Sequence, residues 1–278
     1  MQFAQLKRRD FIRLVGGAAA WPLAARGQQQ VVHPLIGVLS PLSAVSAARN
    51  IAGLRSGLRD LGYMEGRSVT LAPVALGFAR SIARPGGHIT GMWFDYDALV
   101  DKRLEFLKLA VPAVERVGLI VNPDDPTDEV TIRRLKTATR ALGMTLQQFD
   151  VRDVTKLDVT AATIGRAGVE ALFIGDGPTI LSARADIIAM VARLRLPAMY
   201  GFREFADAGG LMSYGYNLPD AYRQMARLVV KILKGDRPGD LPFELPTRYE
   251  LIINLKTAKT IDLTISDSFV LLADEVIE

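Results

Sequence analysis

The sequence predicts an α/β protein whose sheets are largely parallel. Short apolar segments alternate with amphipathic helical stripes along most of the 278 residues, which is the pattern of parallel strands joined by helices. Hydrophobic residues make up 49% of the chain and charged residues 23%, as in a well-buried globular protein. A chain of this length has room for two modest lobes or one large domain.

The first third of the chain predicts three strands and one helix. PLIGVLS at 34–40 is a continuous apolar run of the kind found in buried strands. A helix follows, because apolar residues recur at helical spacing and Gly62 stands at the C-terminal cap position. Its stripe consists of Ile51, Leu54, Leu58 and Leu61. SVTL at 68–71 and HITGMWF at 88–94 predict the second and third strands.

The remainder continues the same alternation. The apolar stripes predict helices over 100–111, 130–142, 155–166, 180–194 and 222–232. Strands are predicted at 116–122, 145–151, 171–174, 197–202, 211–217 and 249–254. Pro219 near the first turn and Gly235 after the last turn mark the ends of the fifth helix. The tail after residue 254 predicts short helical and irregular pieces.

Residues 1–27 have the layout of an export signal. A basic head is followed by an uncharged run of about eleven residues, too short for the roughly twenty that span a bilayer. Arg8 and Arg9, followed by Phe11, are similar to the twin-arginine type of signal. An ordinary amphipathic N-terminal helix is the alternative. We expect cleavage after Gly27 and no lipid anchor or disulfide, because the chain contains no cysteine.

Most of the net charge belongs to this signal. The full chain carries +4, and residues 1–27 contain five of its 34 basic and one of its 30 acidic residues. That leaves 29 of each, so the mature part is formally neutral. No basic block remains that would bind phosphate groups, and the charge therefore argues against a nucleic-acid partner.

Several long motifs resemble one family. They are LIGVLS at 35–40, LRSGLRDLGYMEGRSVTL at 54–71, IARPGGHITGM at 82–92, KRLEFLKLAVP at 102–112, RVGLIVNP at 116–123, YGFREFADAGGLMSYG at 200–215 and LPTRYELIINLKTAKTIDLTI at 245–265. Together they resemble the solute-binding components of bacterial ABC importers. The resemblance implies a type I periplasmic-binding-protein-like fold, in which two Rossmann-like lobes joined by hinge crossings close on a small solute such as an amino acid.

The resemblance also implies a role and partners. We expect a periplasmic monomer that binds its solute reversibly, needs no cofactor and delivers the solute to permease and ATPase subunits. The expected N-terminal lobe comprises 28–94 plus 216–240, and the expected C-terminal lobe comprises 95–215 plus 241–278. Relatives have further strand–helix units after the second strand, whereas here SVTL runs directly into APVALGFARSIARPGG. About fifty to sixty residues are therefore missing from the N-terminal lobe, which keeps its first, second and last strands.

Ligands of open parallel sheets bind beyond the carboxyl ends of the strands. The loops and helix starts at those positions give the candidate ligand-binding residues Ser40, Ser43, Asn122, Asp176, Tyr200, Glu204 and Tyr214. Helix caps or turns are the alternative role for the serines, Asn122 and Asp176, and a surface pair with Arg203 is the alternative for Glu204. Aromatic residues at the lobe crossings, such as Trp93, Phe94 and Tyr216, face either the cleft or the hinge.

Two other functions compete with that of an importer component. A ligand-sensing module for a membrane receptor has no sequence feature that separates it from an importer component. An α/β enzyme has few candidate residues, because there is no cysteine and the two histidines, His33 and His88, have no metal-ligand spacing around them. We expect neither a metal nor a catalytic residue. Because of the missing block, we expect the chain to bind the family's solutes weakly or not at all.

Overall fold

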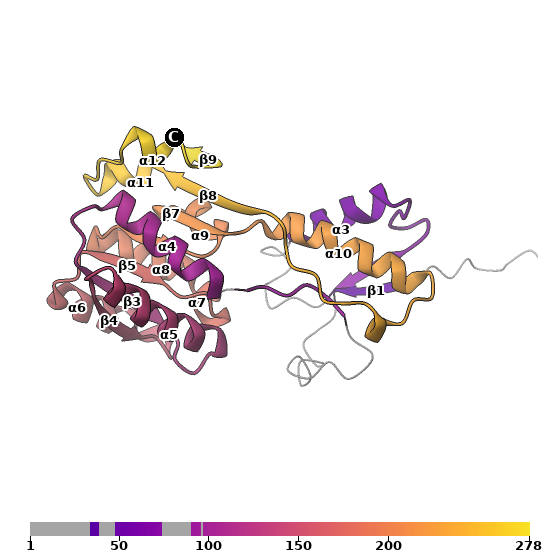
Figure 1. The fold of residues 1–278 in the computed structure, drawn as a ribbon, viewed down its shortest axis with the longest axis horizontal. Helices are drawn as coiled ribbons and strands as arrows, with labels where there is room; N and C mark the ends of the chain where they lie inside the picture. The colour runs from indigo at the N-terminus through magenta and orange to yellow at the C-terminus, as the bar shows by residue number, and fades with distance from the viewer. Residues whose placement is uncertain (1–33, 39–47, 74–89, 96) are drawn as a thin grey trace, which may run out of the picture.

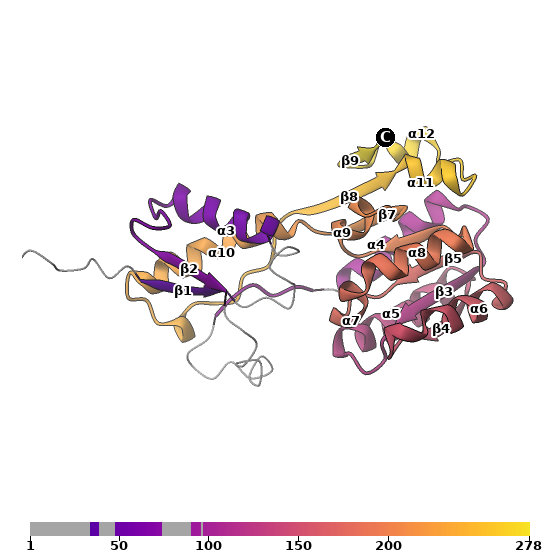
Figure 2. The same ribbon diagram turned by 180° about the vertical axis from the view of Figure 1, so that it is seen from behind.

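The structure is a computed structural model that describes residues 34–38, 48–73, 90–95 and 97–278. Its described residues form two sheets, one of them much larger than the other. Figures 1 and 2 show a large lobe and a small lobe connected by extended segments. We use "large lobe" for residues 97–216 and 249–278, and "small lobe" for the described residues of 34–73 together with 218–240.

The large lobe is built on a sheet with the strand order β4-β3-β5-β6-β7-β8-β9. Its strands run parallel from β4 to β7, and β8 joins β7 in the antiparallel direction. The strands are β3 (Arg116–Val121), β4 (Thr145–Asp150), β5 (Ala171–Ile174), β6 (Ala198–Tyr200), β7 (Met212–Tyr216), β8 (Tyr249–Asn254) and β9 (Glu275–Ile277). The near-continuous burial of β3 and β5 is what a parallel sheet covered on both faces requires.

Helices cover both faces of this sheet. They are α4 (Asp97–Ala110), α5 (Pro126–Ala141), α6 (Leu157–Ala167), α7 (Pro178–Ser182), α8 (Arg184–Leu194), α9 (Arg203–Asp207), α11 (Leu255–Thr260) and α12 (Asp267–Val270), with a 3-10 turn at Val154–Lys156. One core cluster joins α4 and α5 to the sheet through residues such as Leu104, Leu135 and Leu119. The opposite cluster joins α6 and α8 through Ile164 and Ile187.

The small lobe contains the parallel pair β1 (Leu35–Val38) and β2 (Thr70–Pro73), and the helices α3 (Ala48–Asp60) and α10 (Leu218–Leu233). The two helices pack closely, because a Cβ on Gly53 would lie 2.0 Å from the carbonyl oxygen of Pro219. A 3-10 turn at Pro238–Asp240 follows α10. The core of this lobe is a small cluster of Leu54, Leu58, Val69, Ala226 and Val230.

The predicted third strand at 88–94 is wrong for the residues that the structure describes. Residues 90–95 form no strand, and Met92 makes one isolated bridge to Glu244 rather than joining β1 and β2. The side chains from Gly91 to Asp95 are exposed or half-buried, so this segment lacks the buried face that holds a central strand. The second strand lies two residues later than SVTL predicted, and β9 was not predicted.

Candidate functional site

The candidate site is the edge of the large lobe where β3, β5 and β6 end. In a parallel sheet these carboxyl ends lie together, and the loops and helix N-termini beyond them meet there. Both views place α7, which follows β5, on the side of the large lobe that faces the small lobe. The loops after these strands contain Asn122, Asp176 and Gly201.

Asn122 connects two of these loops. Its side-chain amide donates to the hydroxyl oxygen of Thr179 over 3.1 Å, and its side-chain oxygen accepts from the backbone N–H of Asp124. The side chain is half-buried, so one face is accessible at the edge. Asp125 caps α5 by accepting from the N–H of Thr127, which is the turn-forming role that the sequence offered as the alternative for this loop.

Asp128 is fully buried in the first turn of α5. Its carboxylate accepts from the backbone N–H groups of Asn122 (2.8 Å) and Gly177 (3.0 Å), so it joins the loops after β3 and β5. The pKa of Asp128 is raised to about 6, mainly because the carboxyl is buried. The two N–H groups act in the opposite direction, and the nearby carboxylates of Asp176 and Asp125 add a smaller increase. The backbone at Gly175 and Gly177 lies close to Asp128. A Cβ on either glycine would lie within 3 Å of this carboxylate.

Asp176 lies inside the large lobe rather than at its surface. Its side chain is 0% exposed and pairs with Arg103 of α4, whose side chain is equally buried. The carboxylate charge is thus neutralised from within the protein, and in this conformation it offers no surface to a solute ammonium group.

The remaining candidates differ in exposure. Tyr200 is buried and stacks on Phe205 with ring centroids 4.7 Å apart, so its ring belongs to the core. Glu204 is partly exposed at the start of α9. Tyr214 is half-buried and packs edge-on against Phe106. Ser40 and Ser43 lie outside the described residues.

The lobe crossings are packed by aromatic rings. Phe94 contacts Tyr216 edge-on at 5.1 Å, and Tyr216 in turn contacts Tyr249 at 5.1 Å. The hydroxyl of Tyr216 donates to the backbone oxygen of Asp95 over 2.8 Å, which joins the first crossing to β7. These contacts correspond to hinge packing. Trp93 is different, because 62% of its surface is exposed.

Arg203 does not pair with Glu204. Its guanidinium forms ion pairs with Asp207, Glu250 and Glu275, which fasten α9 to β8 and β9. Asp207 also pairs with Arg49 in the first turn of α3, so this contact joins the large lobe to the small lobe. The beginning of α3 therefore lies nearest the large lobe.

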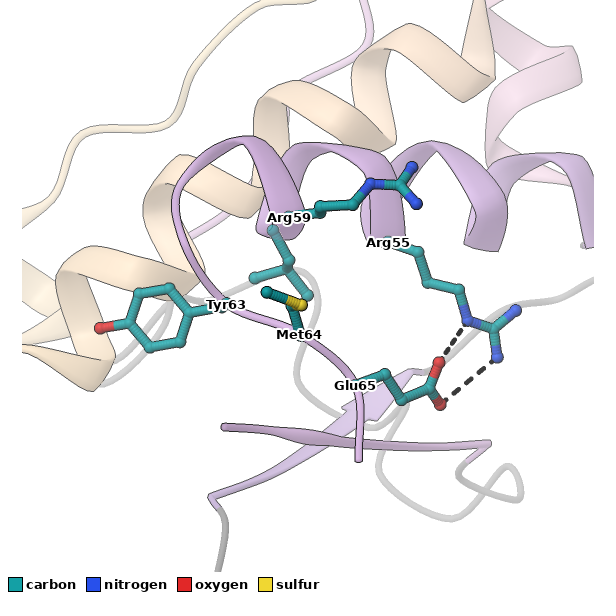
Figure 3. A pocket seen from close by; sticks show the side chains of 6 residues that line it. Arg55, Arg59, Tyr63, Met64 and Glu65 are labelled. Atoms are coloured by element: carbon teal, nitrogen blue, oxygen red, sulfur yellow. Dashed lines mark hydrogen bonds and ion pairs between the residues drawn. The ribbon is translucent and has the colours of Figure 1, made fainter. Parts of the chain in front are cut away.

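Described residues of the small lobe also line cavities, away from the carboxyl ends of the large lobe's strands. One of about 260 Å³ is lined by Arg55, Leu58, Arg59, Tyr63, Met64 and Glu65 at the far end of α3 (Figure 3). Figure 3 shows the ion pair between Arg55 and Glu65 on one side of it, with the ring of Tyr63 on the other. A second, of about 470 Å³, lies between α3 and α10 beside Thr247.

Sequence reasoning missed two residues of this edge, Arg103 and Asp128. Both lie on apolar helix stripes: Arg103 is three residues after Val100, and Asp128 is seven residues before Leu135. A charged side chain at such a position is buried and needs a partner, which is the signal that points to them. In the described ranges, no group of three or more His, Cys, Asp or Glu side chains is arranged to hold a metal ion. The same residues include no helix long and apolar enough to cross a membrane.

Comparison with known proteins agrees with this architecture. The structure resembles a conserved domain protein from Vibrio cholerae (TM-score 0.75, 17% identity, 87% of this chain and 99% of that one). It also resembles an ABC domain from Streptococcus pneumoniae in complex with L-Trp (TM-score 0.74, 19% identity, 88% of this chain and 100% of that one). The fold is therefore of the type I periplasmic-binding-protein kind.

The sequence comparisons identify the family. A curated tyrosine-binding protein from Clostridioides difficile is 23% identical over 192 residues, which cover 69% of this chain and 54% of the relative. The chain thus spans about half the length of this relative. The family model described as ABC transporter substrate binding protein matches residues 68–277. Because that match covers most of the sequence, the chain belongs to the ABC transporter substrate binding protein family.

Proposed function

We propose that this chain is the periplasmic solute-binding component of an ABC importer and that it binds an amino acid between its two lobes. The observation that carries the proposal is the position of the edge of the large lobe where β3, β5 and β6 end. The loops after β3, β5 and β6 lie on the side that faces the small lobe, where closure of the two lobes would enclose a solute.

The accessible groups at this edge suit an amino acid. Asn122 supplies an amide and Glu204 a carboxylate for a solute ammonium group, while Tyr214 supplies a half-buried aromatic ring. Ser40 and Ser43, which lie outside the described residues, are proposed as further solute contacts. One relative is named a tyrosine-binding protein, and a structural neighbour was solved in complex with L-Trp. Both favour an aromatic amino acid as the solute. In this role the chain acts as a monomer without cofactor or turnover, and hands the solute to permease and ATPase subunits.

Ligand-detected NMR tests this function. Each of the natural amino acids is added at millimolar concentration to the purified mature chain, and saturation transfer from protein to amino acid is measured. We expect transfer to an aromatic amino acid, with the amino acid unchanged after prolonged incubation. Absence of transfer to every member of the panel, or formation of a product, would contradict the proposal.

Export provides a separate prediction. We propose that residues 1–27 are a twin-arginine signal and that the mature chain begins near Gln28. Replacing Arg8→Lys and Arg9→Lys together keeps the charge but removes the arginine pair that the receptor reads. Uncleaved precursor should then accumulate in the cytoplasm, as fractionation and immunoblotting would show. Export at the natural level would mean that the twin-arginine assignment is wrong; replacing Lys7→Arg, which leaves the pair intact, is the matched control.

A further inference from the structure

Arg103 is the largest of the fully buried side chains in the described part of the protein. An arginine stays charged at any physiological pH, and a buried charge is costly unless it is paired and hydrogen-bonded. Arg103 lies on α4 beside Leu104, in the stripe that packs on the sheet. Its burial therefore depends on acceptors that other parts of the large lobe supply.

Those acceptors come from three successive segments of the sheet edge. The Nη1 atom donates to Asp176, in the loop after β5. The Nη2 atom lies 3.4 Å from the backbone oxygen of Gly201, directly after β6. The Nε atom donates to the backbone oxygen of Tyr214 in β7 over 2.6 Å. One planar guanidinium thus fastens three chain segments at once, with donors spread over three nitrogen atoms, whereas the three donors of a lysine all lie on one nitrogen.

The backbone is packed tightly around this group. A Cβ on Gly201 would lie 1.7 Å from Oδ1 of Asp176, and a Cβ on Gly215 would lie 2.0 Å from the backbone oxygen of Gly201. The Oδ1 atom of Asp176 is buried and has no hydrogen-bond partner among the described groups. It therefore lies against the backbone of Gly201, where a solute has no access.

We propose that Arg103 is a positioning residue for solute binding, which holds the segments after β5 and β6 and the middle of β7 in fixed relative positions without touching the solute. The inference rests on the proposed function. Recognition groups must be held to a fraction of an ångström by supporting residues, and those near this edge, Glu204 and Tyr214, belong to the same segments that Arg103 fastens. Asp176, a candidate contact from the sequence, becomes the internal partner of this positioning residue.

A double variant separates positioning from folding. Arg103→Met combined with Asp176→Asn removes both charges, so that no lone buried charge remains, and the thermal unfolding midpoint should stay close to that of the natural chain. Arg103→Lys is a second variant, which retains the positive charge beside Asp176 but lacks the planar guanidinium and its spread N–H donors. Arg134→Met is the matched control, because Arg134 pairs with Asp101 between two helices at the surface.

Two readouts decide the outcome. We expect hydrogen exchange at the amides of Gly177, Phe205 and Gly215 to become at least about tenfold faster in the double variant and in Arg103→Lys. Saturation transfer to L-tryptophan should be lost in both and kept in Arg134→Met. Unchanged exchange, or faster exchange with undiminished transfer, would overturn the proposal. If the natural chain transfers nothing to any amino acid, the proposed function fails and the positioning role fails with it, whereas loss confined to the Arg103 variants supports both.

Discussion

Replacing Gly201→Ala is expected to lower the free energy of unfolding by about 3 kcal/mol or more. The added Cβ would lie 1.7 Å from Oδ1 of Asp176 and 2.8 Å from Nη2 of Arg103, so the buried ion pair must move apart. Separating the partners of a buried pair typically costs about 3–5 kcal/mol, because each charge is left uncompensated. In a chain of this size we expect the unfolding midpoint to fall by roughly 6–12 °C.

Gly165→Ala is the matched control for this substitution. Gly165 lies exposed in α6, and the nearest atom to its added Cβ is a Leu194 carbon at 3.8 Å, an ordinary contact. Alanine in an exposed helix should leave stability unchanged or raise it by about 0.5–1 kcal/mol. Thermal and urea unfolding of both variants measure the difference. Equal stability of Gly201→Ala and the natural chain would show that the packing around Asp176 is loose.

The second large effect is a dependence of stability on pH that comes from Asp128. The folded state raises the pKa of this carboxyl from 3.8 to about 6. A raised pKa means that the folded state binds the proton more tightly than the unfolded state does. The resulting stabilisation is fully present below pH 3.8 and is lost as the pH rises through about 6. A shift of about two units corresponds to about 3 kcal/mol.

Urea unfolding at intervals between pH 4 and pH 7.5 tests this dependence, with the Asp128→Asn variant as the comparison. The natural chain should lose roughly 2–2.5 kcal/mol more than the variant across that window, because at pH 4 the carboxyl of the unfolded chain is already more than half ionised. Burial also raises the pKa of Glu250, which lies in β8, but that contribution is common to both proteins and cancels in the comparison. Parallel pH profiles for the two proteins would contradict the assignment to Asp128.

The sequence predicted the regular elements of the large lobe because their patterns are local. The stripe that begins at Val100 lies on helix α4 in the structure, and the apolar run after Arg116 forms the buried strand β3. The segment 88–94 also has a strand-like composition, but whether it joins a sheet depends on which distant segment it pairs with. Its residue Met92 forms a single β-bridge with Glu244. No local pattern contains that information.

The candidate site was harder to predict for the same reason. The sequence indicates Asp176 as a candidate contact, but the glycines on either side of it make room for another protein group, the carboxylate of Asp128. The structure shows Gly177 beside Asp128, and Gly201 beside Asp176. Gly177 and Asp128 lie 49 residues apart in the chain, and Arg103 and Gly201 lie 98 residues apart, so inspection of one sequence cannot pair them. The apolar stripe around Arg103 signals that its side chain is buried, but its partners are set by tertiary packing.

We propose that the large lobe keeps a strand-end edge able to bind a solute, and that a shortened small lobe limits the affinity. The two strands of the small lobe's described sheet leave few places for directed polar groups. Loss of three hydrogen bonds to a charged solute group, at roughly 1.5–3 kcal/mol each, would weaken binding by about 4.5–9 kcal/mol. Micromolar affinity corresponds to only about 8 kcal/mol in total. The natural chain should therefore bind no more tightly than the millimolar range.

Calorimetric titration with L-tryptophan tests this claim most directly, comparing the natural chain with a variant that carries the missing block of a full-length relative. Because β2 extends to Pro73, the block is inserted after that residue, and circular dichroism verifies that the variant is folded. We predict millimolar or weaker binding by the natural chain and at least about a thousandfold tighter binding by the variant. Micromolar binding by the natural chain, or no gain in the folded variant, would contradict the account.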